Sequence, residues 1–311
     1  MSSFTLLLQR HSKELFIILA IAFTCTTPAL SLFAGLVYAL TLGNPFASES
    51  KKISKKLLQY SVIGLGFGMN LHASLQSGKD GMLFTIFSVT AIMVVGWFLG
   101  KLIKLPKGTS YLISAGTAIC GGSAIAAVAP LTKSDESEIS VSLATIFVLN
   151  AIALFIFPPI GHLLGMNDHQ FGTWAAMAIH DTSSVVGAGA AYSEKALEIA
   201  TTVKLTRALW IIPLAFVTTF IFNDKNAKIN IPWFIFFFVL AMIANTYLPI
   251  PSVITSSIVW LSRKALILTL FLIGAGLSRS VIKSVGLRPM ILGVLLWIFI
   301  GIVSLTFIML F

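Results

Sequence analysis

Two adjacent ionisable residues, His180 and Asp181, lie near the centre of the apolar segment 171–191. An ionisable side chain at the centre of a bilayer costs about 2.5–3.5 kcal/mol on insertion scales, and it commonly marks a substrate pathway or a proton relay. Histidine titrates near neutral pH, so His180 has the chemistry to couple transport to a proton. Asp181 could hold a proton or a sodium ion. A hydrogen-bonded pair that only joins two helices is the structural alternative.

Three hydroxyl residues, Thr182, Ser183 and Ser184, follow this pair and raise the question of a serine hydrolase. A Ser-His-Asp triad needs three side chains that meet along one proton path, and neighbouring residues of a single helix cannot easily do so. The Gly-x-Ser-x-Gly turn of α/β-hydrolases is also absent from the sequence. We therefore expect no catalytic residues, and an intramembrane enzyme is kept only as an alternative.

Two basic residues, Lys204 and Arg207, stand three positions apart at the start of the apolar segment 203–222. This spacing places them on one face of a helix. They could attract an anion into a cavity, so we include both among the candidate substrate-binding residues. Long basic side chains also reach out to lipid headgroups from within a membrane, and that alternative stays open.

Glycine-containing stretches interrupt two long apolar segments, at 116–126 and 272–279. Glycine lacks the Cβ atom that stiffens a helix, so Gly121 and Gly122 allow the first segment to unwind. Unwound backbone at membrane depth is tolerated only where protein or a water-filled cavity satisfies its polar groups. Ser123 is expected to cap the half-helix that follows, over residues 124–131.

The second stretch has similar ingredients, and we expect it to unwind at its glycines and to be capped by its serine. If the two breaks meet, two helix N-termini with free N–H groups converge on one cavity, which suits an anion. The carbonyl ends of the first half-helices could coordinate a cation at the same crossing. The expected substrate-binding residues at the breaks are Gly121, Gly122, Ser123, Gly274, Gly276, Leu277 and Ser278.

Glycine also permits close packing of helices, so either stretch could be a packing contact only. Gly64 and Gly68 fit such a small-residue face, which could serve a homodimer. Three asparagines within apolar segments could contact substrate or bond a neighbouring helix. Two of them join the expected ion-coupling set, which is His180, Asp181, Asn70 and Asn150.

The composition indicates a membrane protein, since 57% of the 311 residues are hydrophobic and only 10% are charged. Soluble domains carry roughly 25% charged residues. The net charge of +10 does not indicate nucleic-acid binding, because the charges fall in short gaps between apolar segments, as topology signals do. The two cysteines, Cys25 and Cys120, form neither a disulfide framework nor a metal cluster. No cofactor or metal is expected.

We expect about eleven transmembrane helices, since a span needs about 20 apolar residues. Pro28 divides the long apolar run 14–46 into two short spans, although a single span is the alternative. Basic residues in alternate gaps place the N-terminus in the cytoplasm by the positive-inside rule. The expected spans are 14–27, 29–46, 57–76, 82–102, 110–131, 140–163, 171–191, 203–222, 231–249, 253–281 and 289–310.

The spans divide into an extra N-terminal helix, over 1–28, and two halves of five spans, over 29–165 and 170–311. Five is odd, so the second half must enter the membrane from the side opposite to the first. The predicted fold is therefore an all-α membrane protein with two inverted five-helix repeats. The glycine breaks fall in the fourth span of each repeat, which is the sequence pattern that points to a transporter site.

Five stretches of the chain resemble one family. The stretch 116–130, Gly-Thr-Ala-Ile-Cys-Gly-Gly-Ser-Ala-Ile-Ala-Ala-Val-Ala-Pro, closely resembles the signature of the YeiH-type sulfate exporter family, although that family has Ala as often as Gly at 122. His180-Asp181 and the stretches 64–71, 204–207 and 271–278 add further matches. The resemblance implies a relationship to bile-acid sodium symporter-like transporters, whose core domain holds two crossed, broken helices.

The sequence thus favours a secondary transporter of a small anion, such as sulfate or an organic sulfonate, in a bacterial inner membrane. Its expected partners are that solute and lipids, not nucleic acid. A proton or sodium ion is expected to drive it. A sodium-coupled uptake carrier for an organic anion, an intramembrane enzyme and a channel are the alternatives. The chain contains no Gly-x-x-x-x-Gly-Lys-Ser/Thr motif, so ATP-driven transport would need a separate subunit.

Overall fold

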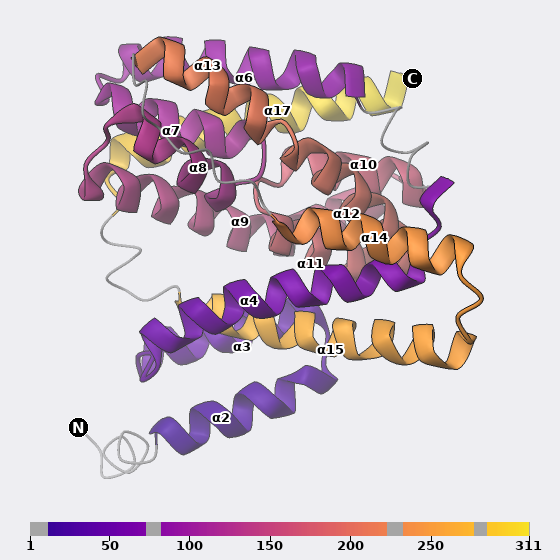
Figure 1. Ribbon diagram of the computed structural model, residues 1–311. Coiled ribbons are helices and arrows are strands. Elements are labelled where there is room, and N and C mark those ends of the chain that lie inside the picture. The colour runs from indigo at the N-terminus through magenta and orange to yellow at the C-terminus, as the bar shows by residue number, and fades with distance from the viewer. Residues whose placement is uncertain (1–11, 73–81, 223–232, 277–284, 311) are drawn as a thin grey trace. The chain divides into compact units, whose positions relative to one another are not determined.

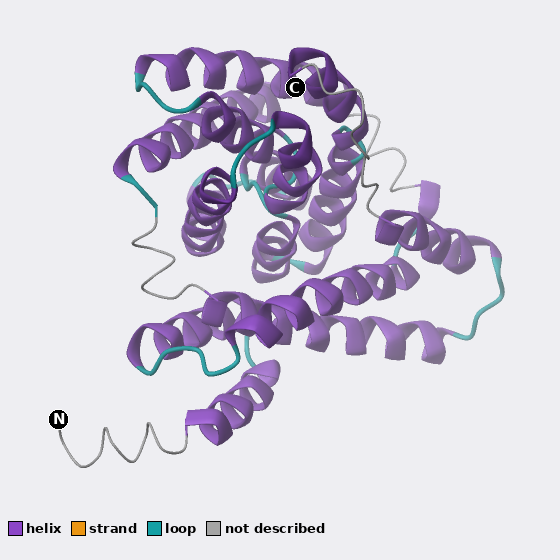
Figure 2. Ribbon diagram, turned by 60° about the vertical axis from the view of Figure 1, so that its left-hand side comes forward, coloured by secondary structure: helices purple, strands orange, loops and turns teal. Residues whose placement is uncertain are grey.

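The computed structural model describes residues 12–72, 82–222, 233–276 and 285–310 (Figure 1). All regular structure in these residues is helical, as Figure 2 shows, and the all-α prediction is confirmed for them. The chain divides into two compact units. Unit 1 comprises Met1–Leu71 and Trp233–Ile282, and unit 2 comprises His72–Pro232 and Lys283–Phe311.

Five helices of unit 1 are described, together with two short 3-10 turns. The first two are separate, because Thr27 caps a new helix that has Pro28 as its first residue. Residues 14–42 therefore do not form one continuous helix, and their division into two membrane spans stays a prediction. The elements are α2 (Ser12–Ala22), η1 (Phe23–Cys25), α3 (Pro28–Thr41), α4 (Ala47–Leu65), η2 (Gly66–Gly68), α14 (Trp233–Tyr247) and α15 (Ser252–Gly276).

Helix α15 is continuous through Gly274, so the predicted unwinding at that residue is wrong. The reason is close packing against α3. A Cβ atom on Gly274 would collide with the Leu32 carbonyl oxygen, and one on Gly35 would collide with the Phe271 carbonyl oxygen. These two glycines bring the helix backbones together, as small residues do inside membranes. The helix extends to Gly276, and the rest of the predicted break lies outside the described residues.

Helix α4 packs against α15 through glycines in the same way. A Cβ atom on Gly64 would collide with the Ser262 side chain, and one on Gly68 would lie 2.9 Å from a Val259 methyl group. Polar caps also reach α15, since Asn44 Nδ2 donates to the Ala275 carbonyl at 3.0 Å. Gly64 and Gly68 therefore pack helices within unit 1.

Nine helices of unit 2 are described, and short interruptions separate α7 from α8, α10 from α11 and α12 from α13. Helix α9 begins at a capping box in which Asp135 and Glu138 satisfy each other's backbone N–H groups. The elements are α6 (Met82–Leu102), α7 (Lys107–Ala118), α8 (Gly122–Thr132), α9 (Glu136–Leu163), α10 (Asp168–Ala178), α11 (Thr182–Tyr192), α12 (Glu194–Ala208), α13 (Ile211–Phe222) and α17 (Leu287–Leu310).

Each of the eleven predicted spans contains a helix, but only some of these helices are long. Among the described residues, five stretches are long and apolar enough to cross a membrane, and the chain is a helical membrane protein. They are Phe84–Leu102, Glu136–Leu163, Glu194–Phe222, Ser252–Gly276 and Leu287–Leu310. Shorter apolar helices cover Leu30–Thr41, Gly122–Thr132 and Trp233–Tyr247.

The two units do not follow the predicted halves of the chain. Segment 29–165 and segment 170–311 each contribute helices to both units. The packing of the molecule therefore gives no support to a boundary near residue 165. The inverted repeat itself stays a prediction.

Candidate functional site

The first predicted break is present, between α7 and α8. Helix α7 ends at Ala118, and Gly121 has φ +61°, a conformation that L side chains rarely adopt. The Gly121 N–H donates to the Gly116 carbonyl at 2.8 Å and closes the turn. Gly121 itself is the N-cap of α8, so the prediction that Ser123 caps this helix is wrong. Ser123 is the second residue of α8, and its side chain is exposed.

A second break lies in unit 2, between α10 and α11. Helix α10 ends at Ala178, and the next three residues include His180 and Asp181. Asp181 is the N-cap of α11, where its carboxylate accepts the Ser183 N–H at 3.0 Å. Sequence reasoning placed both residues correctly at mid-segment but missed the break. The Asp-Thr-Ser-Ser order was the available signal, because Asp is a preferred N-cap residue.

The two breaks of unit 2 meet. A Cβ atom built on Gly121 would lie 3.2 Å from both the Cα and the Cβ atom of Asp181. The break of α7/α8 and the break of α10/α11 are therefore in contact within unit 2, and we call this contact the crossing. The predicted crossing of 116–126 with 272–279 stays a prediction: α15 is continuous at Gly274, and residues 277–279 lie outside the described part of the chain.

Asn150 of α9 accepts hydrogen bonds from the non-helical backbone of the second break. Its Oδ1 accepts the His180 N–H at 3.1 Å and the Asp181 N–H at 3.2 Å. These two N–H groups belong to non-helical backbone and would otherwise lack an acceptor at membrane depth. The Asn150 side chain is only 3% exposed, and its Nδ2 donor has no hydrogen-bond partner in the described part of the chain. The oxygen of this amide is therefore used by the protein, and its buried nitrogen has hydrogen-bonding capacity left over.

Lys204 of α12 covers the carbonyl end of α10. Its Nζ donates to the Ile179 carbonyl at 2.7 Å and to the Ala176 carbonyl at 3.2 Å. The residue is 0% exposed, so the alternative that it extends to the headgroups is wrong. A positive charge at a helix C-terminus is favourable because the last carbonyl groups have no helical donor.

Arg207, one turn further along α12, donates to the carbonyl end of α7. Its Nη2 donates to the Ala118 carbonyl at 2.7 Å, and its Nη1 donates to Ser88 Oγ at 3.0 Å and lies 3.5 Å from Thr85 Oγ1. Arg207 is 1% exposed, which also excludes a headgroup contact. Sequence reasoning missed Ser88 of α6, since a single serine in an apolar helix gives no signal. Whether the two basic residues also touch an anion stays a prediction.

His180 is 1% exposed, and neither of its ring nitrogens has a hydrogen-bond partner among the described residues. Ser183 Oγ instead donates to the Asp181 carboxylate. The three residues therefore do not form the serine-to-histidine hydrogen bond of a catalytic triad.

The N-terminus of α8 is the end of a half-helix that remains open at the crossing. The first N–H groups of a helix have no intrahelical acceptor. The N-cap of α8, Gly121, has no side chain to accept a hydrogen bond, whereas the N-cap of α11 is Asp181, whose carboxylate accepts one. Gly122 is partly buried, and Ser123 is exposed. The crossing thus presents donors at α8 and at Asn150, together with two buried cations and one carboxylate.

The remaining predicted site residues belong to unit 1 or are not described. Asn70, Gly274 and Gly276 belong to unit 1, whereas the α7/α8 and α10/α11 breaks belong to unit 2. Leu277 and Ser278 lie outside the described residues. Their role in binding stays a prediction. Within the described chain, no group of three or more His, Cys, Asp or Glu side chains could hold a metal ion.

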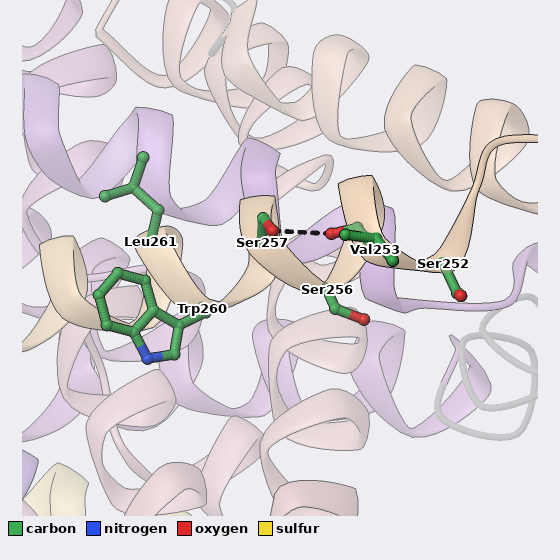
Figure 3. Close-up of a pocket in the computed structure, with 6 residues that line it drawn as sticks. All are labelled: Ser252, Val253, Ser256, Ser257, Trp260 and Leu261. Atoms are coloured by element: carbon green, nitrogen blue, oxygen red, sulfur yellow. Dashed lines mark hydrogen bonds between the residues drawn. The ribbon is translucent and has the colours of Figure 1, made fainter.

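Figure 3 shows an open depression on α15 in unit 1. It is lined by Ser252, Val253, Ser256, Ser257, Trp260 and Leu261. All six come from one helix, and none is charged. Ser257 Oγ is already bonded to the Val253 carbonyl, as the dashed line shows. The depression therefore lacks the converging donors that the unit 2 crossing has.

Comparison with known proteins identifies relatives along almost the whole chain. A UPF0324 membrane protein of Bacteroides thetaiotaomicron is 62% identical over 285 residues, covering 91% of this chain and 86% of the relative. A UPF0324 membrane protein of Porphyromonas gingivalis is 57% identical over 289 residues, covering 91% and 87%. A UPF0324 membrane protein of Geobacter sulfurreducens is 45% identical over 286 residues, covering 91% and 92%. No solved structure matches the chain.

The names of these relatives state membrane proteins and no substrate, so the resemblance to sulfate exporters stays a prediction. The family model described as "Conserved hypothetical protein 698" matches residues 15–293 and so includes both breaks of unit 2. The chain belongs to the conserved hypothetical protein 698 family, whose relatives found here are bacterial UPF0324 membrane proteins.

Proposed function

We propose that the chain is a secondary active transporter of a small anion, which binds where α7/α8 and α10/α11 cross. One observation carries this proposal: the carbonyl ends at the crossing are occupied, while donors remain unpaired. Lys204 and Arg207 bond the last carbonyls of α10 and α7. Asn150 Nδ2 has no acceptor within the described residues, and the N-cap of α8 is Gly121, which offers no side-chain acceptor to the first N–H groups of that helix. A ligand that completes this site must accept hydrogen bonds.

The charge balance at the crossing also favours an anion. Lys204 and Arg207 carry two positive charges, and Asp181 carries one negative charge. One positive charge is therefore in excess, and the two basic side chains are almost entirely buried. A buried charge without a partner is costly in a low-dielectric interior. A bound anion would neutralise the excess, and the α8 dipole would add to the attraction.

Asp181 is the proposed coupling residue. It packs against Gly121 at the start of α8, beside the proposed anion site. An ionised Asp181 would repel an anion there, whereas a protonated Asp181 would not. Proton binding and anion binding are therefore linked in the same direction, which is the arrangement of proton–anion cotransport. His180 is proposed to accept a proton within the same pathway.

The wider features of the proposal come from the sequence. They are an eleven-span topology with a cytoplasmic N-terminus, two inverted repeats, a bacterial inner membrane location and a sulfate-like or sulfonate-like substrate. Gly122 and Ser123 would bind the anion mainly through backbone N–H groups. Alternating access would come from movement of the unit that holds the crossing against the rest of the chain.

The test is the substitution Asn150→Asp. It keeps the oxygen that accepts from His180 and Asp181 but replaces the free Nδ2 donor with a second carboxylate oxygen. Loss of a hydrogen bond to a charged ligand corresponds to roughly tenfold weaker binding or more. Purified protein would be screened by thermal shift against sulfate, sulfite, taurine and dicarboxylates, and the best ligand used in proteoliposome counterflow.

Asn167→Asp is the matched control. Asn167 is exposed and caps α10 through its oxygen, a task that Asp performs equally well. We expect this variant to keep ligand binding and counterflow, while Asn150→Asp loses both and remains folded. If Asn150→Asp binds the anion as tightly as the wild type does, the proposed site is wrong. Flux without saturation or counterflow would indicate a channel, and product formation without flux would indicate an enzyme.

A further inference from the structure

We infer that Lys204 is a tethered cation that fills a carbonyl site at the helix crossing, so that this chain needs no sodium ion there. The part of this inference that concerns transport rests on the proposed function. The structural part does not, because it concerns only the contacts of Lys204.

The site consists of carbonyl oxygens at an interrupted helix. The Ala176 and Ile179 carbonyls both reach Lys204 Nζ, at 3.2 and 2.7 Å, where α10 ends. Half-helix ends and unwound carbonyls are the groups that coordinate sodium in transporters with broken helices. An ammonium group is a compact point charge with three donors, so it can take the place of such an ion. Lys204 is fully buried, so its charge is not shared with solvent.

The surrounding charges fit one resident cation. Asp181 and Arg207 both interact electrostatically with Lys204. Asp181 is the negative group that a sodium site would use, and here it faces an ammonium that is already in place. A free cation would meet two fixed positive charges in a poorly solvated interior, where like charges repel strongly.

The same device is present at the other half-helix. Arg207 Nη2 occupies the Ala118 carbonyl at the end of α7. Lys204 and Arg207 come from one turn of α12, so a single helix supplies a cation to each broken partner. The two carbonyl ends of the crossing are thus neutralised by the protein itself. This arrangement discriminates between the two coupling ions left open by the sequence and favours a proton over sodium.

The experiment is a thermal-shift comparison of the wild type, Lys204→Ala and Lys195→Ala in sodium, methylammonium and choline chloride at equal ionic strength. Lys195 lies on α12 but is exposed, so its removal is the control. We expect the wild type and Lys195→Ala to melt at the same temperature in all three salts. Lys204→Ala should melt about 5 °C or more lower in choline. Sodium or methylammonium should recover part of that loss by binding the vacated carbonyls.

Two results would overturn the inference: a wild-type protein that sodium stabilises relative to choline, or a Lys204→Ala variant that no cation stabilises. If Lys204→Ala does not fold, the sodium response of the wild type decides alone. Because chloride is the anion in all three salts, differences between them report cation binding only, and the outcome is separate from that of the proposed function. If methylammonium stabilises Lys204→Ala but no anion binds in any screen, the inference about Lys204 is supported and the proposed anion site is contradicted.

Discussion

Gly274 of unit 1 and Gly121 of unit 2 act in opposite ways. Gly274 lies within a continuous helix and, with Gly35, lets the backbones of α15 and α3 come close together. Gly121 has a positive φ and lies in the turn that separates α7 from α8. Gly274 and Gly121 both lie in apolar segments, and neither has a proline next to it. The residue type alone therefore does not determine whether the helix breaks.

The difference lies in what surrounds the glycine. Around Gly274 the nearest atoms are the Leu32 and Leu36 backbone of a packed neighbour, which supplies no long polar side chain. Around the breaks of unit 2, Arg207, Lys204 and Asn150 receive the freed carbonyl and N–H groups. A break inside a membrane needs such partners, since lipid offers none. Buried polar side chains elsewhere in the sequence are thus as informative as the glycines.

The largest effect is expected from Arg207→Met, which tests this dependence directly. Methionine keeps most of the apolar volume but leaves the Ala118 carbonyl and Ser88 without their donor. Each unsatisfied buried group costs about 1–3 kcal/mol, so we expect a loss of about 3 kcal/mol in the free energy of unfolding. The melting temperature in detergent measures it. Arg288→Met, at an exposed arginine of α17, should change little. Equal stability of the two variants would contradict the requirement for a capping cation.

The sequence predicted the broad composition of this site better than its arrangement. The break at Gly121, the central position of His180 and Asp181, and the shared helix face of Lys204 and Arg207 all follow from local pattern. The contact between the first break and the α10/α11 break does not follow from such a pattern. The glycine pattern pointed to Gly274 and Gly276, whereas the α10/α11 break contains no glycine between Ala178 and Thr182. That break depends on Asn150 and Lys204, which lie 30 residues before and 24 residues after His180 in the chain. Local sequence pattern does not reveal such distant partners.

The next effect compares the two glycines by the same substitution, Gly274→Ala and Gly121→Ala. In unit 1 the new methyl group would press on the Leu32 carbonyl, and in unit 2 it would strain a positive φ and press on Asp181. Overpacking or backbone strain typically costs about 1–3 kcal/mol, so both variants should lose about 2 kcal/mol of stability. Only Gly121→Ala should also weaken anion binding, because only Gly121 lies at the crossing. Thermal melts and ligand-induced shifts separate the two effects.

Gly276→Ala is the control for Gly274→Ala, since it lies on the same helix and has open space where a Cβ atom would stand. We expect its melting temperature to stay near that of the wild type. A Gly276→Ala variant that loses anion binding would restore the sequence-based assignment of this residue to the site. A Gly274→Ala variant that loses ligand binding but not stability would show that unit 1 contributes more than packing.

The smallest effect concerns two serines in equivalent positions. Ser123 and Ser183 are each the second residue of the half-helix that follows a break, in α8 and α11. Ser183 is buried and bonded to Asp181, so Ser183→Ala should cost about 1 kcal/mol, the worth of one hydrogen bond. Ser123 is exposed and does not cap α8, so Ser123→Ala should change stability by less than about 0.5 kcal/mol.

The same pair tests how the open helix end binds its ligand. If the anion is held by backbone N–H groups of α8, Ser123→Ala keeps those donors and weakens binding by no more than about threefold, which is less than the worth of a typical hydrogen bond. Isothermal titration with the best ligand of the thermal-shift screen measures this change. A hundredfold loss would make the hydroxyl the main ligand. It would also mean that anion binding at the start of α8 depends on the Ser123 side chain rather than on the backbone N–H groups that follow Gly121.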